Sequence, residues 1–391
     1  MELLTFNVND GFPEALIRGL RSSFIRKEEY DAIRDCTNLS DVKMVLEETD
    51  YLPFLQSEPT PAPTSVIRNK MKEKLAKEFD FIKSSSSPDL YNFLEKVSHR
   101  FMIDNVVNMI EVVKNRDAKR LKVSPDPLGY FRGMEDILRF DGEDIAELYQ
   151  IVLIDTPIGE YFNRLLEDLI NAGALQNRSL DDVHRQFAEI TPEILRISLR
   201  KMWLEDLHEI CRSLNSISNE VLLDLIKFEA DCMTIQIIYN SLNNPDLNKQ
   251  SERESGRRAL CPNIGYLYPD YEQQLNKVYD LLTLRQAVDS FPMYKNMLSR
   301  VPDPSNEKEM KSADMKTLDD MMYEIGILKY SMAFDQQFHY GAFYAYLKLK
   351  EQEIRNIVWL SEMVNIQKPK DETAWRKYEN LIPFHCLRGN S

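Results

Sequence analysis

The sequence predicts an all-α protein, and three observations support this fold class. Glycine is scarce, with 12 residues in a chain of 391, so few of the tight turns that join β-strands are available. Apolar residues recur at intervals of three and four, the spacing that places side chains on one face of a helix. Convincing alternation of apolar and polar residues, which would indicate strands, is absent from the sequence.

Three stretches show the helical period most clearly. The first begins at Leu90 and has apolar residues at Leu90, Leu94, Val97, Phe101, Val106, Met109, Ile110 and Val113. The second has Ile145, Leu148, Tyr149 and Val152 on one side. The third, which contains no proline, carries one stripe at Met321, Ile325, Leu328 and Met332 and another at Ile354, Ile357 and Val358. We expect a break in this third stretch near Gly341, because one unbroken helix of about 45 residues would reach roughly 70 Å.

Short polar segments divide these helices. Proline and clustered serine interrupt helical patterns at Ser57–Ser65, Ser84–Pro88, Ser124–Pro127 and Pro302–Glu309. The sequence therefore predicts helical blocks joined by short breaks.

A helix–corner–helix motif recurs along the chain. The segments Val45–Leu55 and Val152–Phe162 share the pattern Val-Leu, any residue, acid, Thr, then an aromatic residue five positions on, and a looser copy includes Asp289. Hydroxyl side chains at such corners accept hydrogen bonds from the free backbone N–H groups of the next helix. We expect helix caps at Thr49, Thr156 and Ser290.

An apolar helical run follows each corner. The runs are Met102–Ile110, Met233–Leu242 and Ile354–Met363, so corner and run recur with a period on the order of 120 residues. This pattern predicts three divergent helical repeats, at residues 1–120, 121–245 and 246–391, the last with a C-terminal tail.

Composition excludes several classes of function. Apolar residues make up 43% and charged residues 29%, as in soluble folded proteins, while the net charge of −14 argues against nucleic acid as a partner. The N-terminus has neither the basic nor the apolar region of a signal peptide, and no apolar stretch approaches the roughly 20 residues of a membrane span. The five cysteines are scattered, so reduced thiols are expected.

Catalytic, cofactor and metal motifs are not found. The histidines and cysteines lack metal-ligand spacing, and neither a phosphate-binding loop nor a dinucleotide-binding glycine pattern is present. The run Asp319–Glu324 places its third carboxylate five residues after the first, one too many for a shared helical face, and Asp181-Asp182 is followed by Arg185 at that position. We expect a solvated acidic helix start, and no catalytic, cofactor or metal site.

Charged residues also sit beside apolar ones in the late helices. They are Glu229 and Asp231 in one segment, and Glu351, Glu353, Arg355 and Asn356 in another. A solvated helix face is one interpretation. We favour a polar seam where helical units meet, in which Glu351 or Glu353 pairs with Arg355 or with a partner elsewhere.

Specific stretches then suggest a family. They are "FNVNDGF" at 6–12, "IRG" at 17–19, "TDY" at 49–51, "MIDNV" at 102–106, "IDTP" at 154–157, "FEAD" at 228–231, "QFHYGAFYAYLKLKEQEIRNIVW" at 337–359 and "YENLIPF" at 378–384. Nearly end to end, the chain resembles the family of subunit d of vacuolar-type proton-translocating ATPases, which is related to the C-type subunits of prokaryotic rotary ATPases. It departs from the family pattern at Leu52, at Cys232-Met233, where two arginines are usual, and in a longer tail after Phe384.

The resemblance implies a fold and a role. It implies three related helical bundles arranged pseudo-threefold as a funnel, on the cytosolic face of vacuolar or other endomembranes and peripheral to them. Its implied partners are the proteolipid c-ring, the central stalk subunits D and F, and the pump's a-type subunit as a further candidate. The implied role is a non-catalytic rotor adaptor that couples ATP hydrolysis to proton transport. The net charge of −14 favours a basic stalk end.

Two other functions remain open from the residues alone. A generic all-helical scaffold in membrane trafficking fits the composition but not these motifs. A helical magnesium-dependent enzyme would need the carboxylate spacing that is missing. Co-purification partners distinguish the three.

Overall fold

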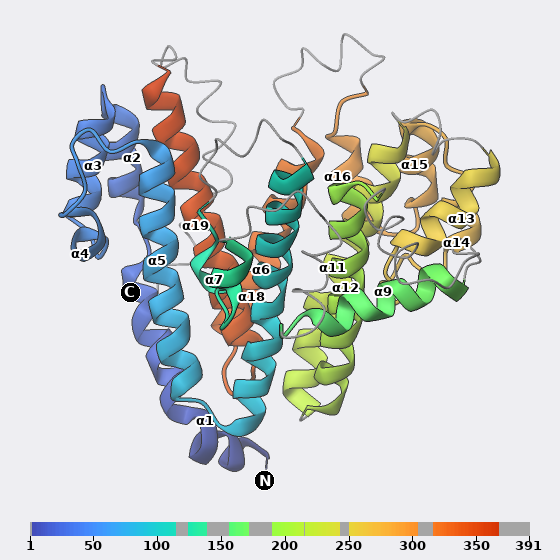
Figure 1. Ribbon diagram of the computed structural model, residues 1–391, viewed down its shortest axis with the longest axis horizontal. Coiled ribbons are helices and arrows are strands. Elements are labelled where there is room, and N and C mark those ends of the chain that lie inside the picture. The colour runs from blue at the N-terminus through green and yellow to red at the C-terminus, as the bar shows by residue number, and fades with distance from the viewer. Residues whose placement is uncertain are drawn as a thin grey trace.

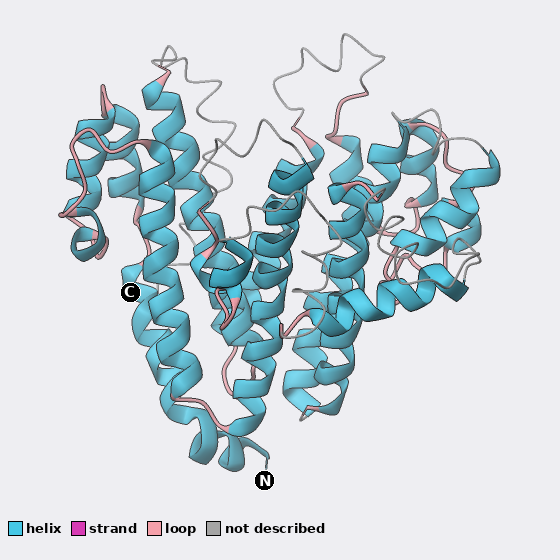
Figure 2. Cartoon of the chain, viewed as in Figure 1, coloured by secondary structure: helices cyan, strands magenta, loops and turns pink. Residues whose placement is uncertain are grey.

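The computed structural model describes residues 2–114, 124–138, 156–171, 190–214, 216–242, 250–303 and 316–366. All regular secondary structure in these ranges is helical (Figure 2), which confirms the all-α prediction. The predictions made for Ile145–Val152 and for Asp181–Arg185 lie outside the described residues.

The helices of the N-terminal half run from α1 to α9. Their bounds are α1 Glu2–Gly19, η1 Leu20–Ser23, α2 Lys27–Asp35, α3 Leu39–Glu47, α4 Leu52–Leu55, α5 Thr64–Ser84, α6 Pro88–Lys114, η3 Pro127–Gly129, α7 Met134–Leu138 and α9 Gly159–Asn171. The predicted breaks at Ser57–Ser65 and Ser84–Pro88 coincide with the ends of α5.

The C-terminal half contains two further pairs of long helices with shorter ones between them. Its helices are α11 Pro192–Ser213, α12 Ser216–Leu242, α13 Gln250–Leu260, α14 Glu272–Leu275, α15 Leu281–Ala287, α16 Pro292–Ser299, α18 Leu318–Asp335 and α19 Gly341–Asn365. The break between α18 and α19 confirms the one predicted near Gly341.

Six of the described helices form a closed ring. They pair as the hairpins α5–α6, α11–α12 and α18–α19, and contacts between α6 and α11, α12 and α18, and α19 and α5 close the circle. The hairpin turns recur at intervals of about 125 residues and lie at the same end of the molecule, the lower end in Figure 1. Each hairpin falls within one predicted repeat, while the repeat boundaries and the pseudo-threefold relation stay predictions.

Polar contacts tie this lower end together. The carboxylate of Asp10 on α1 accepts hydrogen bonds from Ser87 Oγ at 2.8 Å and from Tyr340 Oη at 2.9 Å, which joins α1 to two of the turns. The Tyr340 N–H donates to Ser218 Oγ at 3.0 Å, which joins the α18–α19 turn to α12. Gly341 allows this approach, because a Cβ there would lie 2.7 Å from Val221 Cγ1.

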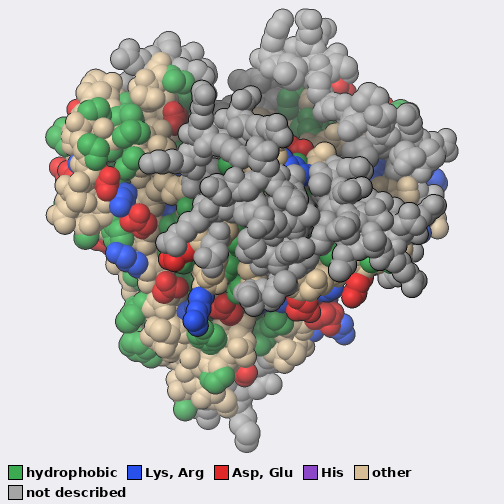
Figure 3. Space-filling model, in the orientation of Figure 1, with side chains coloured by type: hydrophobic (Ala, Val, Ile, Leu, Met, Phe, Trp, Pro, Cys, Tyr) green, Lys and Arg blue, Asp and Glu red, His purple; other side chains and the backbone are tan. Residues whose placement is uncertain are grey.

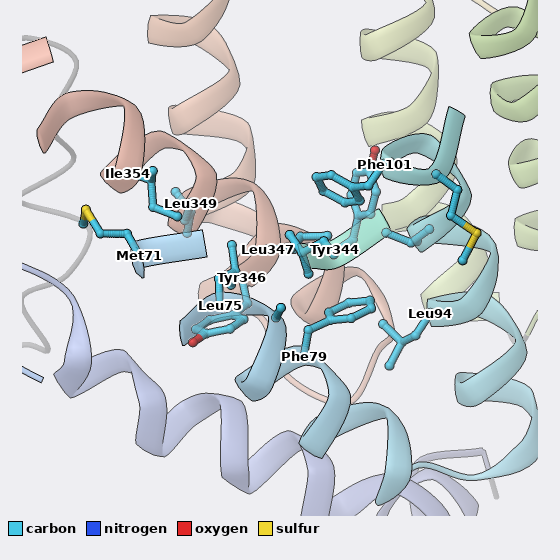
Figure 4. Packing of buried hydrophobic residues seen from close by; sticks show 14 of the residues in the cluster. Met71, Leu75, Phe79, Leu94, Phe101, Tyr344, Tyr346, Leu347, Leu349 and Ile354 are labelled. Carbon is cyan, nitrogen blue, oxygen red and sulfur yellow. The ribbon is translucent and has the colours of Figure 1, made fainter. Parts of the chain in front are cut away.

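The main core lies between α5, α6 and α19. The predicted apolar face of α6 is buried along its whole length, and so are Ile354, Ile357 and Val358 on α19, as predicted. Figure 4 shows how α5 and α6 contribute Met71, Leu75, Phe79, Leu94 and Phe101, which pack against the aromatic and aliphatic face of α19. Burial of these side chains supplies the main favourable free energy of folding.

A second core joins α12 to the shorter helices. Ile235 and Ile238 of α12 pack with Leu284, Tyr294 and residues of the preceding loop. The α13–α16 segment thus packs against α11, α12 and the start of α18.

The apolar stripe predicted on α18 is only partly correct. Met321 is buried, but Leu328 is 48% exposed and Met332 is 67% exposed. The helix instead buries Ile327 and Phe334, because its contacts with α12 and α19 lie on a face rotated from the predicted one.

The structure gives a different outcome for each of the three predicted helix caps. Thr49 Oγ1 accepts a hydrogen bond from the Tyr51 N–H at 3.3 Å and donates one to the Leu46 carbonyl at 2.7 Å. Thr49 lies two residues before Tyr51, the residue that flanks the start of α4. Thr156 lies three residues before α9, and its carbonyl accepts the Gly159 N–H at 3.0 Å. A capping role for the Thr156 side chain stays a prediction.

The cap predicted at Ser290 is wrong. Phe291 flanks α16, and no side chain caps this helix. Pro292 begins it and keeps Phe291 extended, at φ −112° and ψ 98°, so Ser290 lies outside the first turn.

We predict that Thr49→Ala lowers the free energy of unfolding by about 1 kcal/mol, because the corner loses a side-chain hydrogen bond to a free backbone N–H. Ser290→Ala is the matched control and should change it by less than about 0.5 kcal/mol. Urea unfolding followed by circular dichroism measures both values. Equal destabilisation by the two changes would contradict this assignment.

Candidate functional site: a cavity between the long helices

A cavity of about 1180 Å³ lies between α6, α11, α12, α13, α18 and α19. It is lined by the N-terminal part of α11, the C-terminal half of α12, α18 as far as Tyr330, and the middle of α19 from Lys348 to Arg355. The hairpin turns are packed together at one end of the ring, the lower one in Figure 1, and the cavity begins beyond them. A cavity of this size exceeds what most small-molecule sites require.

Glu229 is the centre of a polar cluster in the cavity wall. Its carboxylate accepts hydrogen bonds from Tyr330 Oη and Tyr344 Oη, both at 2.7 Å, and from Lys348 Nζ at 2.9 Å. Burial alone would raise the pKa of Glu229, but Lys348 and Arg100 outweigh burial and lower it. The cluster thus holds an ionised carboxylate that joins α12 to α18 and α19.

A second set of charges joins α6 to its neighbours. Arg100 forms an ion pair with Glu351 of α19. Asp104, one turn further along α6, accepts hydrogen bonds from Arg200 Nε at 3.0 Å and Nη2 at 2.5 Å. Arg196 lies near the same aspartate, with Nε 3.9 Å from its carboxylate. These bonds lock α6 against α11 and α19 around the cavity.

Arg355 is arranged differently from the other cavity arginines. Its guanidinium lies over the ring of Tyr323, with Cζ 3.4 Å from the ring centroid. The side chain is exposed in the cavity wall, and no ion pair or hydrogen bond to it occurs among the described residues. Surrounding protein lowers the pKa of Arg355 to about 10, so the group stays charged at neutral pH.

The six residues predicted as a polar seam fall into separate sets. Glu229, Glu351 and Arg355 line the cavity. Glu351 forms an ion pair with Arg100, and Glu353 forms one with Lys350, so neither pairs with Arg355. Asn356 accepts a hydrogen bond from Gln352 Nε2 at 2.8 Å, on a buried part of α19.

Glu353 belongs to a buried cluster near the N-terminal helices. It accepts from Lys350 Nζ at 3.0 Å, the Tyr51 hydroxyl at 2.6 Å and the Ile25 N–H at 2.7 Å. The side chains of Lys350 and Glu353 are 1% and 3% exposed. This pair fastens α19 to the segment before α2 and to the corner that contains Tyr51.

Asp231 forms a third set, behind the cavity. Its carboxylate accepts from the Leu267 N–H at 2.8 Å and from the Tyr294 hydroxyl at 2.7 Å. The backbone of Gly265 packs so closely that a Cβ there would lie 2.3 Å from Asp231 Oδ1. Burial raises the pKa of Asp231 to about 6, since its hydrogen bonds do not fully offset the loss of water around the carboxylate.

The acidic run Asp319–Glu324 divides between two environments. Asp319 and Asp320 occupy the first turn of α18, where the helix dipole favours negative charge. Glu324 faces away and pairs with Lys316 at 2.6 Å and Arg300 at 3.1 Å. Within the described residues, no group of carboxylates, histidines or cysteines is placed to hold a metal ion.

Sequence reasoning missed Arg100, Tyr323, Tyr330 and Lys348 in this cavity, and the buried Tyr344 that bonds to Glu229 in its wall. One signal could have found two of them, because Tyr344, Lys348, Glu351 and Arg355 recur at helical spacing on a helix whose other positions are mostly buried. Cys232 and Met233, at the departure from the family pattern, also lie in the cavity wall. None of the helices in the described ranges is both long and apolar enough to cross a bilayer.

We predict that Lys350→Met destabilises the protein by about 3–5 kcal/mol, because it leaves the Glu353 carboxylate buried without its cation. Arg212→Met is the control, since it removes an ion pair with Glu209 whose side chains are 60% and 66% exposed. The control should cost less than about 1 kcal/mol. Urea unfolding of both variants at neutral pH tests the difference, and similar losses would refute it.

We also predict a pH-dependent effect at Asp231. Its folded pKa of about 6 lies above the unfolded value of about 3.9, so its contribution to stability is fully present below the unfolded pKa. That contribution is lost as pH rises through 6. The difference in unfolding free energy between the parent and Asp231→Asn should therefore shift by on the order of 1–3 kcal/mol between pH 4 and pH 7.5. A constant difference across this range would contradict the prediction.

Comparison with known proteins places this architecture in a family. Residues 13–376 match the family described as ATP synthase (C/AC39) subunit. V-type proton ATPase subunit d of Dictyostelium discoideum is 36% identical over 93% of both chains. A probable V-type proton ATPase subunit d of Oryza sativa subsp. japonica is 34% identical, over 93% of this chain and 94% of the relative. Subunit d of Saccharomyces cerevisiae is 30% identical, over 93% and 96%. The chain therefore belongs to the ATP synthase (C/AC39) subunit family, as its sequence motifs indicate, and is a non-catalytic V-type ATPase subunit.

Proposed function

We propose that this chain is the rotor adaptor of a V-type proton ATPase. In this role it links the central stalk, subunits D and F, to the proteolipid ring on the cytosolic face of a vacuolar or other endomembrane. The observation that carries the proposal is the closed ring of helices around a cavity, with its hairpin turns packed together at one end. Family membership supplies the pump in which such a part would act.

The cavity between the long helices suits a docked stalk. Four of the ring helices are 18 to 27 residues long in the hairpins α11–α12 and α18–α19, and all four contribute to the cavity wall. Charged side chains cross-link these walls at Glu229, Arg100 and Asp104. A wall joined in this way resists shear, which transmission of rotation requires.

The packed end suits attachment to a second body. On α1, Val8 is 83% exposed and Phe12 is 65% exposed, and their spacing of four residues puts them on one helical face. The N-terminal half of α1 lies at the narrow lower end (Figure 1), and hydrophobic side chains are visible on the surface there (Figure 3). Exposed apolar side chains at one end are consistent with a protein contact such as the proteolipid ring.

We predict that membranes lacking this subunit do not acidify on addition of ATP, although the detached catalytic sector still hydrolyses ATP. The reason is that the subunit supplies the joint and none of the catalytic residues. Acidification measured with a pH-sensitive dye, together with ATPase activity of the released sector, tests both parts. Normal ATP-driven acidification without the subunit would overturn the proposal.

Complementation makes this test sharper. The parent chain and Leu282→Asp, a change at a residue of α15 that is 57% exposed, should restore acidification. Phe12→Asp should restore it poorly, because it places a charge at the proposed ring contact. If Phe12→Asp restores it fully, the packed end is not that contact.

A further inference from the structure

Helix α1 has an exposed apolar face and a buried acidic face. Val8 and Phe12 are 83% and 65% exposed. Asp10 and Glu14, which are also four residues apart, are 1% and 6% exposed and lie on the opposite side of the helix. Carboxylates are rarely buried to this extent without binding partners. The partners of these two acids therefore show how α1 is attached to the rest of the molecule.

Asp10 holds α1 at the point where the hairpin turns meet. Its Oδ1 accepts a hydrogen bond from the Ser87 N–H at 2.9 Å, and its Oδ2 accepts from Ser87 Oγ at 2.8 Å and Tyr340 Oη at 2.9 Å. Ser87 directly precedes α6 and Tyr340 directly precedes α19, and the Tyr340 N–H donates to Ser218 Oγ of α12. One carboxylate of α1 is therefore connected, directly or through Tyr340, to all three hairpins.

Glu14 holds the loop that precedes α19. Its Oε1 accepts hydrogen bonds from the Phe338 N–H at 3.1 Å and from Arg18 Nη2 at 2.9 Å. Phe338 has a φ of 65°, a left-handed backbone conformation that is costly for a bulky side chain. The ring of Phe6 packs edge-on against the ring of Phe338, with the centroids 6.3 Å apart. Such a conformation persists only where surrounding contacts hold it, and two of these contacts come from α1.

The apolar and polar attachments of α1 respond differently to a sideways load. Apolar burial, which α1 has at Phe6 and Ile17, is non-directional, so side chains that slide past one another keep much of it. A hydrogen bond weakens steeply as its angle departs from linear, and hydrogen bonds to a carboxylate are among the stronger ones. A load applied to the exposed face of α1 is therefore resisted first by the hydrogen bonds of Asp10 and Glu14.

We propose that α1 is a coupling latch, in which Asp10 and Glu14 transmit torque between the three hairpins and a partner bound on the face of Val8 and Phe12. The latch rests on the proposed function, in which that partner is the proteolipid ring. The two carboxylates are positioning residues in this role. Without them the ring contact still forms, but α1 yields under load, and ATP hydrolysis runs without a matching movement of protons.

The coupling ratio of complemented membranes tests this proposal. Membranes that lack the subunit receive full-length variants, and the rate of proton uptake is divided by the rate of ATP hydrolysis in the same vesicles. Asp10→Ala removes all three hydrogen bonds of the carboxylate. Asp10→Asn keeps one acceptor oxygen and can donate to a neighbouring hydroxyl. Asp335→Ala is the matched control, since the Asp335 side chain is 51% exposed and pairs with Arg21 at 3.3 Å.

We expect Asp10→Ala to lower the ratio of proton uptake to ATP hydrolysis at least threefold, with the variant still bound to the membranes. Asp10→Asn should lower the ratio less, and Asp335→Ala should change it less than twofold, because an exposed ion pair contributes little. In the isolated full-length chain, hydrogen exchange of the α1 amides should become at least tenfold faster in Asp10→Ala, while exchange in the middle of α5 and α6 stays unchanged.

The outcomes separate the latch from the adaptor role. An unchanged ratio in Asp10→Ala, whether or not both rates fall, would refute the latch and leave the adaptor role intact. Failure of the parent to restore acidification would refute the adaptor role, and hydrogen exchange would then decide the attachment of α1. Faster exchange confined to α1 would support it, and unchanged exchange would overturn it. Faster exchange throughout the chain, or loss of both Asp10 variants from the membranes, would show a role in folding alone and would also overturn the latch.

Discussion

The closed ring depends on the meeting of three hairpin turns at one end. Tyr340 makes this meeting possible, because its hydroxyl bonds to Asp10 of α1 and its N–H bonds to Ser218 of α12. Its ring packs against Phe6 at 5.8 Å and Phe93 at 6.3 Å. Beyond these turns the long helices of the ring surround a space that their side chains do not fill. The cavity is the geometric result, and ion pairs between the walls limit how far they separate.

Helix α19 has two faces with different roles. One face buries aliphatic and aromatic side chains against α5 and α6 (Figure 4). The other presents Lys348, Glu351 and Arg355 to the cavity, with the buried Tyr344 bonded to Glu229 in the cavity wall. Three of these four bond across to α6 or α12, so the helix that fills the core also fastens the cavity walls. Loss of its register would disturb both at once.

Sequence patterns correctly predicted those parts of the fold that are determined by residues close together in the chain. Scarce glycine, helical spacing in α6 and the break before Gly341 each follow from a few neighbouring residues. The α18 stripe was only partly correct, because the helical period identifies faces of a helix but not which face meets a neighbour, and Leu328 lies on the outer one. The ion pair of Arg100 with Glu351 spans 251 residues, and no local pattern could have predicted it. The cavity is lined by residues that lie far apart in the sequence, so the sequence analysis missed most of them.

Net charge describes the whole chain and not any one of its surfaces. A sum over the chain weights every ionisable group equally, whereas a docking partner meets only those that face it and lack a partner. Exposed carboxylates such as Glu209 contribute to the −14 without reaching the cavity. Inside it, ion pairs neutralise Lys348 and Arg100, while Arg355 lies over the ring of Tyr323 and near the carboxylates of Asp319 and Asp320. The charge that a recessed surface presents is therefore set by which groups of either sign the fold leaves without an ion pair.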